Sequence, residues 1–387
     1  MPINYQELQP QIHILGEHAL QREHSLRERR EQALRLLQQA AAQPQRLRER
    51  IELAALQDPR LRCAAPAAEG LTLHRPPPHQ DQPRTLLAAD GSQIPPDRHA
   101  AVEFALLNVG LIEMHPQEAA APQEHITTLL LADDEDHPTG APLTEEAVEN
   151  RRDILERQVL ARRAAQLPGP VVALTDGPLE LFRETGQPEL RQYLDELRSL
   201  ARLSVITAGY VEILKAQLVV RALELLILAE DELGRASQLR PLFGVDDGDL
   251  FRGLLDVGER SAVFALQSNR AQSYSQELAL HFFYLNVGRP HQPYLARVEI
   301  PAWVAQEPAS VDLLHAALLA QCALLGSRPY PYILQRAHEV AVVRFEEAEQ
   351  VLLMLQRELI SRGLDPGSLS NKLYHKQMSH QRTRYGR

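Results

Sequence analysis

TLLAADGS, at residues Thr85–Ser92, is the stretch that decides the fold class, because a short apolar run ends there in Asp90-Gly91. VVALTDGP, at Val171–Pro178, repeats this arrangement and places Asp176 before a glycine. Apolar runs of this length, bounded by turn residues, are typical of strands in a covered sheet. The two stretches therefore predict two buried strands, each ending in an aspartate.

Further strands and helices are expected around these two runs. Ala101–Ile112, Ile126–Leu131 and Leu203–Ala208 have strand-like patterns. Thr144–Leu167, which opens with an N-cap threonine and acidic residues, predicts a helix, as does Glu189–Ala201. This order of strands and helices predicts an α/β fold, a ribonuclease-H-like mixed sheet flanked by helices.

The two ends of the chain are expected to be mainly helical. Tyr5–Leu56 predicts an N-terminal helical arm, and the prolines at 76–78 predict a linker after it. The other predicted segments are a helix, a group of strands and two C-terminal helices, at Val211–Leu233, Gly258–Trp303, Val311–Leu325 and Ile333–Arg362.

The composition is that of a folded globular protein, and it argues against several classes of protein. Hydrophobic residues make up 44% of the 387 residues, and the net charge of -10 at pH 7 argues against a basic nucleic-acid coat. Two cysteines without a CxxC pair predict neither a zinc site nor a disulfide framework. No signal core is present, and no apolar run reaches the ~20 residues of a membrane span, so we expect a soluble cytoplasmic protein.

The two Asp-Gly motifs carry the first functional hypothesis. If Asp90 and Asp176 lie on neighbouring strands, their carboxylates repel each other unless a cation joins them. Mg²⁺ and Mn²⁺ prefer oxygen ligands, and two such ions can activate water for phosphodiester hydrolysis. The alternative stays open, since Asp-Gly after a strand is also ordinary turn chemistry.

Glu156 is a candidate for a third carboxylate. It lies in the middle of the predicted helix Thr144–Leu167, from which it can reach the same site. Asp153 and Glu149 on the same helix are its rivals. The alternative for Glu156 is a place on a solvated helix face, where Glu and Arg residues commonly lie.

An ordered set of motifs extends from about Arg84 to Leu355. The motifs are LLAADGSQ, the Arg-rich helix with Glu156, VVALTDGPLE, ITAGYVE, LLDVGERSAVF, HFFYLNVG, ARVEIPAWV and RPYPYILQRAHEVA. Their content and order resemble the NurA nucleases. The resemblance implies a helical arm and Pro-rich linker at 1–80, a NurA-like nuclease domain at 81–365 and a basic flexible tail at 366–387.

The resemblance also implies which residues form a catalytic and metal-binding site. Asp90 and Asp176 match the family's two catalytic aspartates, and Glu156 is similar to the glutamate between them. Tyr330 and His338 match the tyrosine and histidine of the C-terminal segment, with His338 as a metal ligand or phosphate contact. A neutral imidazole suits Mn²⁺ better than Mg²⁺. A structural helix histidine and a packed aromatic are the alternatives for these two.

Three further residues are candidates for contacts with DNA. Tyr210 occupies a family motif position, and its ring would line a channel for the strand. Arg336 and Lys215 are weaker candidates for phosphate contacts, because lone cations are usually surface groups.

The resemblance implies a function as well. It predicts an enzyme that uses Mn²⁺ or Mg²⁺, with two ions, as a single-strand endonuclease and 5′-to-3′ exonuclease on DNA. It also predicts a homodimer that works with a HerA-type hexameric ATPase in end resection at double-strand breaks. The chain has no GxxxxGK[ST] loop of its own, so the ATP-driven step would belong to the partner. The alternative is a non-catalytic ribonuclease-H-like module that binds or regulates a DNA translocase.

Overall fold

The computed structural model describes residues 4–79, 82–96, 103–132, 143–181, 186–212, 215–326 and 328–364. The chain forms two compact units, each built from separate stretches of sequence. The first unit contains Met1–Gln80 and Tyr210–Leu319, and the second contains Asp81–Gly209 and Ala320–Arg387. The predicted nuclease domain at 81–365 is therefore distributed over both units, and the predicted tail at 366–387 lies outside the described residues.

The second unit is a mixed sheet, and it contains both Asp-Gly motifs. Its strand order is β7-β6-β3-β4-β5, with residues 206–209 of β7 in this unit. Strands β3 and β6 are parallel, whereas β4 is antiparallel to both β3 and β5. The bounds are β3 Thr85–Ile94, β4 Phe104–Met114, β5 Gln123–Ala132, β6 Val171–Asp176 and β7 Ile206–Glu212. The mixed α/β fold predicted from the sequence is confirmed.

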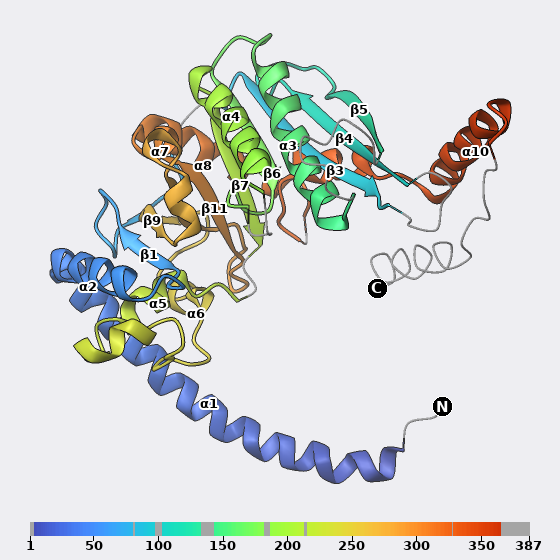
Figure 1. Cartoon of the computed structure of the whole chain (residues 1–387). Helices are drawn as coiled ribbons and strands as arrows, with labels where there is room; N and C mark the ends of the chain where they lie inside the picture. The colour runs from blue at the N-terminus through green and yellow to red at the C-terminus, as the bar shows by residue number, and fades with distance from the viewer. Residues whose placement is uncertain are drawn as a thin grey trace. The chain divides into compact units, whose positions relative to one another are not determined.

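Helices cover both faces of this sheet. On one face α3 (Glu145–Ala164) and α4 (Gln187–Arg202) lie side by side (Figure 1), and α3 packs against β3, β4 and β6. Thr144 caps α3 as predicted, because its side chain accepts the Ala147 N–H at 3.1 Å. The opposite face is covered by α9 (Tyr332–Ala341), which contacts β3 and β4. Strands β3, β4 and β6 are therefore buried on both sides, which explains their long apolar runs.

The single helix predicted for Ile333–Arg362 is wrong. The structure has two helices there, α9 and α10 (Phe345–Ser361), separated at residues 342–344. Side chains from the sheet cause the break. Ser92 Oγ and Asn108 Nδ2 donate to the Ala341 carbonyl, and the Val343 N–H donates to Ser92 Oγ. These bonds replace the helical ones at this point.

The first unit has a smaller antiparallel sheet with strand order β1-β9-β10-β11, and β2 and β8 pair beside β10. The strands are β1 Cys63–Pro66, β2 His74–Arg75, β8 Arg260–Ser261, β9 Phe264–Gln267, β10 Leu280–Asn286 and β11 Leu295–Pro301. The predicted arm is helical, and it is split into α1 (Tyr5–Ala42) and α2 (Pro44–Gln57). The other helices of this unit include α5 Leu218–Glu224, α6 Asp247–Phe251, α7 Ala302–Ala305 and most of α8 Pro308–Ala323.

The long helix predicted for Val211–Leu233 is also wrong. Strand β7 continues to Glu212, and α5 covers only Leu218–Glu224. The buried Asp247 carboxylate accepts the N–H groups of Val219 and Val220 and so fixes where α5 begins. After the end of α5, the Leu225 carbonyl accepts from the Arg50 guanidinium in place of a helical N–H.

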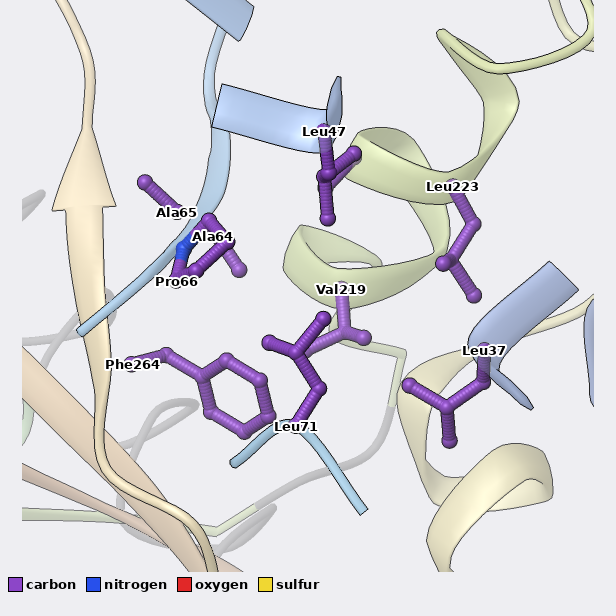
Figure 2. A pocket seen from close by; sticks show the side chains of 10 residues that line it. Leu37, Leu47, Ala64, Ala65, Pro66, Leu71, Val219, Leu223 and Phe264 are labelled. Carbon is purple, nitrogen blue, oxygen red and sulfur yellow. The ribbon is translucent and has the colours of Figure 1, made fainter. Parts of the chain in front are cut away.

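An apolar cavity lies in the first unit where α5 packs on β1 (Figure 2). Its volume is about 10 Å³, and Phe264, Val219 and Leu47 are among the side chains that line it. This space is at most that of one water molecule, and a water there would find no polar partner. The cavity is therefore a packing gap and not a ligand site. No helix in the described part of the chain is long and apolar enough to cross a membrane.

Candidate active site

The parallel pairing of β3 and β6 brings the two aspartates together. Ala89 is in register with Thr175, so Asp90 and Asp176 are the next residues on neighbouring strands. Neighbouring strands lie about 4.8 Å apart, and residues in parallel register face the same side of a sheet. The predicted juxtaposition of the two motifs is thus present in the fold.

Asp90 is not at the end of its strand, contrary to the sequence prediction. Beyond Ala89 the strand loses its partner β6 but stays paired with β4 as far as Ile94. Asp90 therefore lies where the parallel neighbour stops, opposite Gly110 of β4. Asp176 is the last residue of β6 and is exposed, and Gly177 follows it with φ +83°. A glycine is needed at that φ.

His338 on α9 contacts the first aspartate. Its Nδ1 lies 2.7 Å from Asp90 Oδ2. With the proton on Nδ1, the imidazole donates to the carboxylate and carries its lone pair on Nε2. Gly110 permits this approach, since a Cβ there would lie 2.7 Å from the Ala341 nitrogen and 2.8 Å from the Ala337 carbonyl oxygen.

Tyr330 contacts the second aspartate. Its hydroxyl donates to Asp176 Oδ1 at 2.9 Å. Tyr330 lies just before α9, and its side chain is half-buried. Gln321 holds the first turn of α9, because its Oε1 accepts the Ile333 N–H at 2.9 Å. The segment from Tyr330 to His338 thus supplies one polar group to each aspartate.

Glu156 reaches the same strand from the other face. Gly91 points toward α3, and a Cβ on it would lie 2.9 Å from Glu156 Oε1. Glu156 is buried and accepts a hydrogen bond of 2.7 Å from Arg157 Nη1. The pKa of Glu156 is raised to about 8, mainly by burial; Arg157 opposes this rise, whereas the charges of Asp153 and Asp90 contribute to it.

A hydrogen-bonded chain that the sequence analysis missed holds α9 in place. Thr128 of β5 donates to Asn108 Oδ1, and Asn108 Nδ2 donates to the Ala341 carbonyl at 2.9 Å. Ser92 donates to the same carbonyl at 2.5 Å and accepts the Val343 N–H at 3.1 Å. No local pattern marks these residues, because each bond joins segments far apart in the sequence.

The model of the NurA domain matches residues 84–343, which is more than half of the chain. The chain belongs to the NurA family. The match covers all five residues of the candidate active site, Asp90, Glu156, Asp176, Tyr330 and His338.

Three solved structures are similar at low identity. The NurA nuclease from Sulfolobus solfataricus has a TM-score of 0.42 at 14% identity, with 72% of this chain and 85% of that chain covered. The catalytic domain of human Endonuclease V has a TM-score of 0.34 at 16% identity, with 80% and 95% covered. Endonuclease V from Ciona intestinalis, in complex with DNA, has a TM-score of 0.29 at 12% identity, with 70% and 87% covered. No curated protein matches the chain significantly.

The donor set of this NurA-family site suits a hard or borderline divalent cation. Asp90 and Asp176 offer carboxylate oxygens, and His338 offers an imidazole nitrogen. Gly91 leaves room for the side chains of Arg152 and Glu156, and Glu156 thereby brings a third carboxylate to the strand that carries Asp90. Among the described residues, however, no three His, Cys, Asp or Glu side chains form a group that could hold a metal ion.

Glu156 and its rival Asp153 differ in ways that can be tested. Both carboxylates lie near Arg152, at 3.6 Å for Glu156 and 3.4 Å for Asp153, but Glu156 is the one that the structure places against Gly91 of β3. We expect Glu156→Gln to lower metal-dependent DNA cleavage by about 10-fold. Asp153→Asn, the matched control on the same helix, should leave cleavage nearly unchanged. Cleavage rates and thermal unfolding would be measured together, because Arg157 loses a buried partner in the first variant. A larger loss in Asp153→Asn would assign the role to Asp153.

The three predicted DNA contacts have different environments. Tyr210 is fully buried, so a base cannot stack on its ring in this conformation. Lys215 is exposed and open to a phosphate. Arg336 binds both Glu124 and Glu339, and a phosphate would have to displace these carboxylates. Tyr210 and Lys215 belong to the first unit, whereas Arg336 lies in the second unit with the candidate active site.

Proposed function

We propose that the chain is a metal-dependent DNA nuclease that hydrolyses phosphodiester bonds. The observation that carries the proposal is the adjacency of Asp90 and Asp176 on parallel strands, each in contact with a polar side chain of one C-terminal segment. Membership of the NurA family supports it.

The protein's own residues have distinct roles in this proposal. Asp90, Asp176 and His338 would supply the ligands for one or two Mn²⁺ or Mg²⁺ ions, with Glu156 as a further ligand from α3. These side chains do not yet form a three-ligand group in the described structure, so metal binding would have to draw them together. A bound ion would supply Lewis acidity and a water of lowered pKa. The Asp90 carboxylate fixes the tautomer of His338, and the Tyr330 hydroxyl orients Asp176.

The wider function is proposed from the family resemblance. It comprises single-strand endonuclease and 5′-to-3′ exonuclease activity, a homodimer, and action with a HerA-type hexameric ATPase in end resection. The lack of a phosphate-binding GxxxxGK[ST] loop in the sequence supports a separate source of ATP-driven movement.

Metal dependence is the first test. We expect the purified protein to degrade end-labelled single-stranded DNA with Mn²⁺, more slowly with Mg²⁺, and not with excess chelator. A neutral imidazole ligand is the reason for the preference. Circular single-stranded DNA and strands labelled at either end would separate endonuclease from exonuclease cleavage.

Two results would contradict this proposal. Cleavage that persists in chelator would remove the metal from the mechanism. DNA binding without cleavage, under every metal condition, would favour the non-catalytic module that binds or regulates a translocase.

A further inference from the structure

Strand β5 (Gln123–Ala132) forms an open edge of the sheet in the second unit. It is the last strand in the order β6-β3-β4-β5, and β4 is its one partner among the described strands. Within the part of the chain that the structure describes, the backbone groups on its outer side therefore form a row without strand partners. Such an edge, ten residues long, is a template for pairing with another strand.

The side chains of β5 do not protect this edge. Alternate residues are exposed along its whole length, and they include Ile126 at 63% and Leu130 at 49% exposure. The strand contains no proline and no lysine, the residues that commonly block edge pairing. Its charged residue, Glu124, lies near one end and pairs with Arg336 of α9.

We propose that β5 pairs antiparallel with β5 of a second copy of this chain, around a two-fold axis at Thr128. In this register Ile126 lies opposite the partner subunit's Leu130, and Thr128 lies opposite the partner subunit's Thr128. Apolar and Thr–Thr pairs are the cross-strand pairs that stabilise sheets. The inference rests on the proposed homodimer and names the surface through which it forms.

The distribution of charge favours this orientation. An antiparallel pair places the two Glu124 carboxylates at opposite ends, about 27 Å apart over eight residues. Arg336 pairs with both Glu124 and Glu339, which leaves one net negative charge at this end of β5. A parallel pair would put two such negative ends side by side, and like charges opposite each other destabilise a sheet. If the two-fold axis lay at Thr127 instead, Glu124 would face the partner subunit's Leu130. The apolar pair of Ile126 with that leucine would then be lost.

The first test places charge on the edge. We expect the parent to have twice the chain mass of 43.5 kDa by light scattering, and the double variant Ile126→Lys/Leu130→Lys to have the single mass. Leu324→Lys is the control for an added lysine, because Leu324 is 60% exposed, lies in the same unit and is not part of β5. The control should remain dimeric. Circular dichroism would confirm that all three proteins are folded.

The second test reports the register directly. Thr128→Cys should form a disulfide between two copies under mild oxidation, since residues facing each other across such a pair meet disulfide geometry. Glu124→Cys should form none, because the two positions are far apart in the proposed register. The native Cys63 and Cys322 are buried and can be kept.

The outcomes separate this inference from the nuclease proposal. A dimer that survives the double lysine substitution, with no Thr128→Cys disulfide, would overturn the β5 interface alone. A parent protein of single mass would overturn the homodimer and this interface together. DNA cleavage by the parent, measured separately, would still decide the nuclease proposal in either case.

Discussion

Replacing Asp90 by asparagine is expected to lower the rate of single-stranded DNA cleavage by about 10³-fold. The substitution keeps the shape of the side chain but removes the charge that faces His338 at 2.7 Å. It also removes an anionic ligand of the proposed metal site, and losses of several kcal/mol in transition-state stabilisation correspond to such factors. Asp176→Asn should have an effect of similar size, because Asp176 is the corresponding residue on the neighbouring strand.

The measurement is kcat/KM with Mn²⁺ on a labelled oligonucleotide. Asp195→Asn is the matched control, because Asp195 lies on α4 with its side chain 61% exposed and pairs with Arg198 on its own helix. That variant should cleave DNA at the parental rate. Unfolding temperatures should be similar in all the variants. Near-parental cleavage by either active-site variant would refute the proposed role of the carboxylates.

Gly110→Ala is expected to lower both stability and activity. The new Cβ would lie within 2.8 Å of two backbone atoms of α9, so the helix must move away from β4. Overpacking of this kind costs about 1–3 kcal/mol of unfolding free energy. Since α9 carries His338, the same movement would lengthen its contact with Asp90, and a misplacement of about 1 Å can reduce activity by about 10²-fold.

Denaturant unfolding and DNA cleavage, measured on the same preparation, would check this prediction. Gly253→Ala is the control, because a Cβ at Gly253 would meet no atom within 4 Å. A Gly110→Ala protein with parental stability and parental cleavage would show that the close packing of α9 on β4 is not required.

The sequence located most elements of the second unit. Apolar runs bounded by turn residues marked its strands, and the N-cap at Thr144 marked the start of α3. These signals are local, since each depends on residues within a few positions of one another. The two wrong helices, at Val211–Leu233 and Ile333–Arg362, show where such signals fail. In both, side chains from distant segments bind backbone groups and override helical periodicity.

By itself the sequence determined that Asp90 and Asp176 follow buried apolar runs and are each followed by glycine, because that pattern lies in consecutive residues. Only the tertiary structure decided that these runs are parallel neighbours, since long connections separate them in the chain. It also decided that α9 ends on Ser92 and Asn108 and so presents His338 to Asp90. The tertiary structure also decided the environment of Glu156, which is buried beside Arg157. Whether a glutamate in the middle of a helix faces solvent or the core depends on the elements that pack against that helix, and the sequence of the helix alone does not specify them.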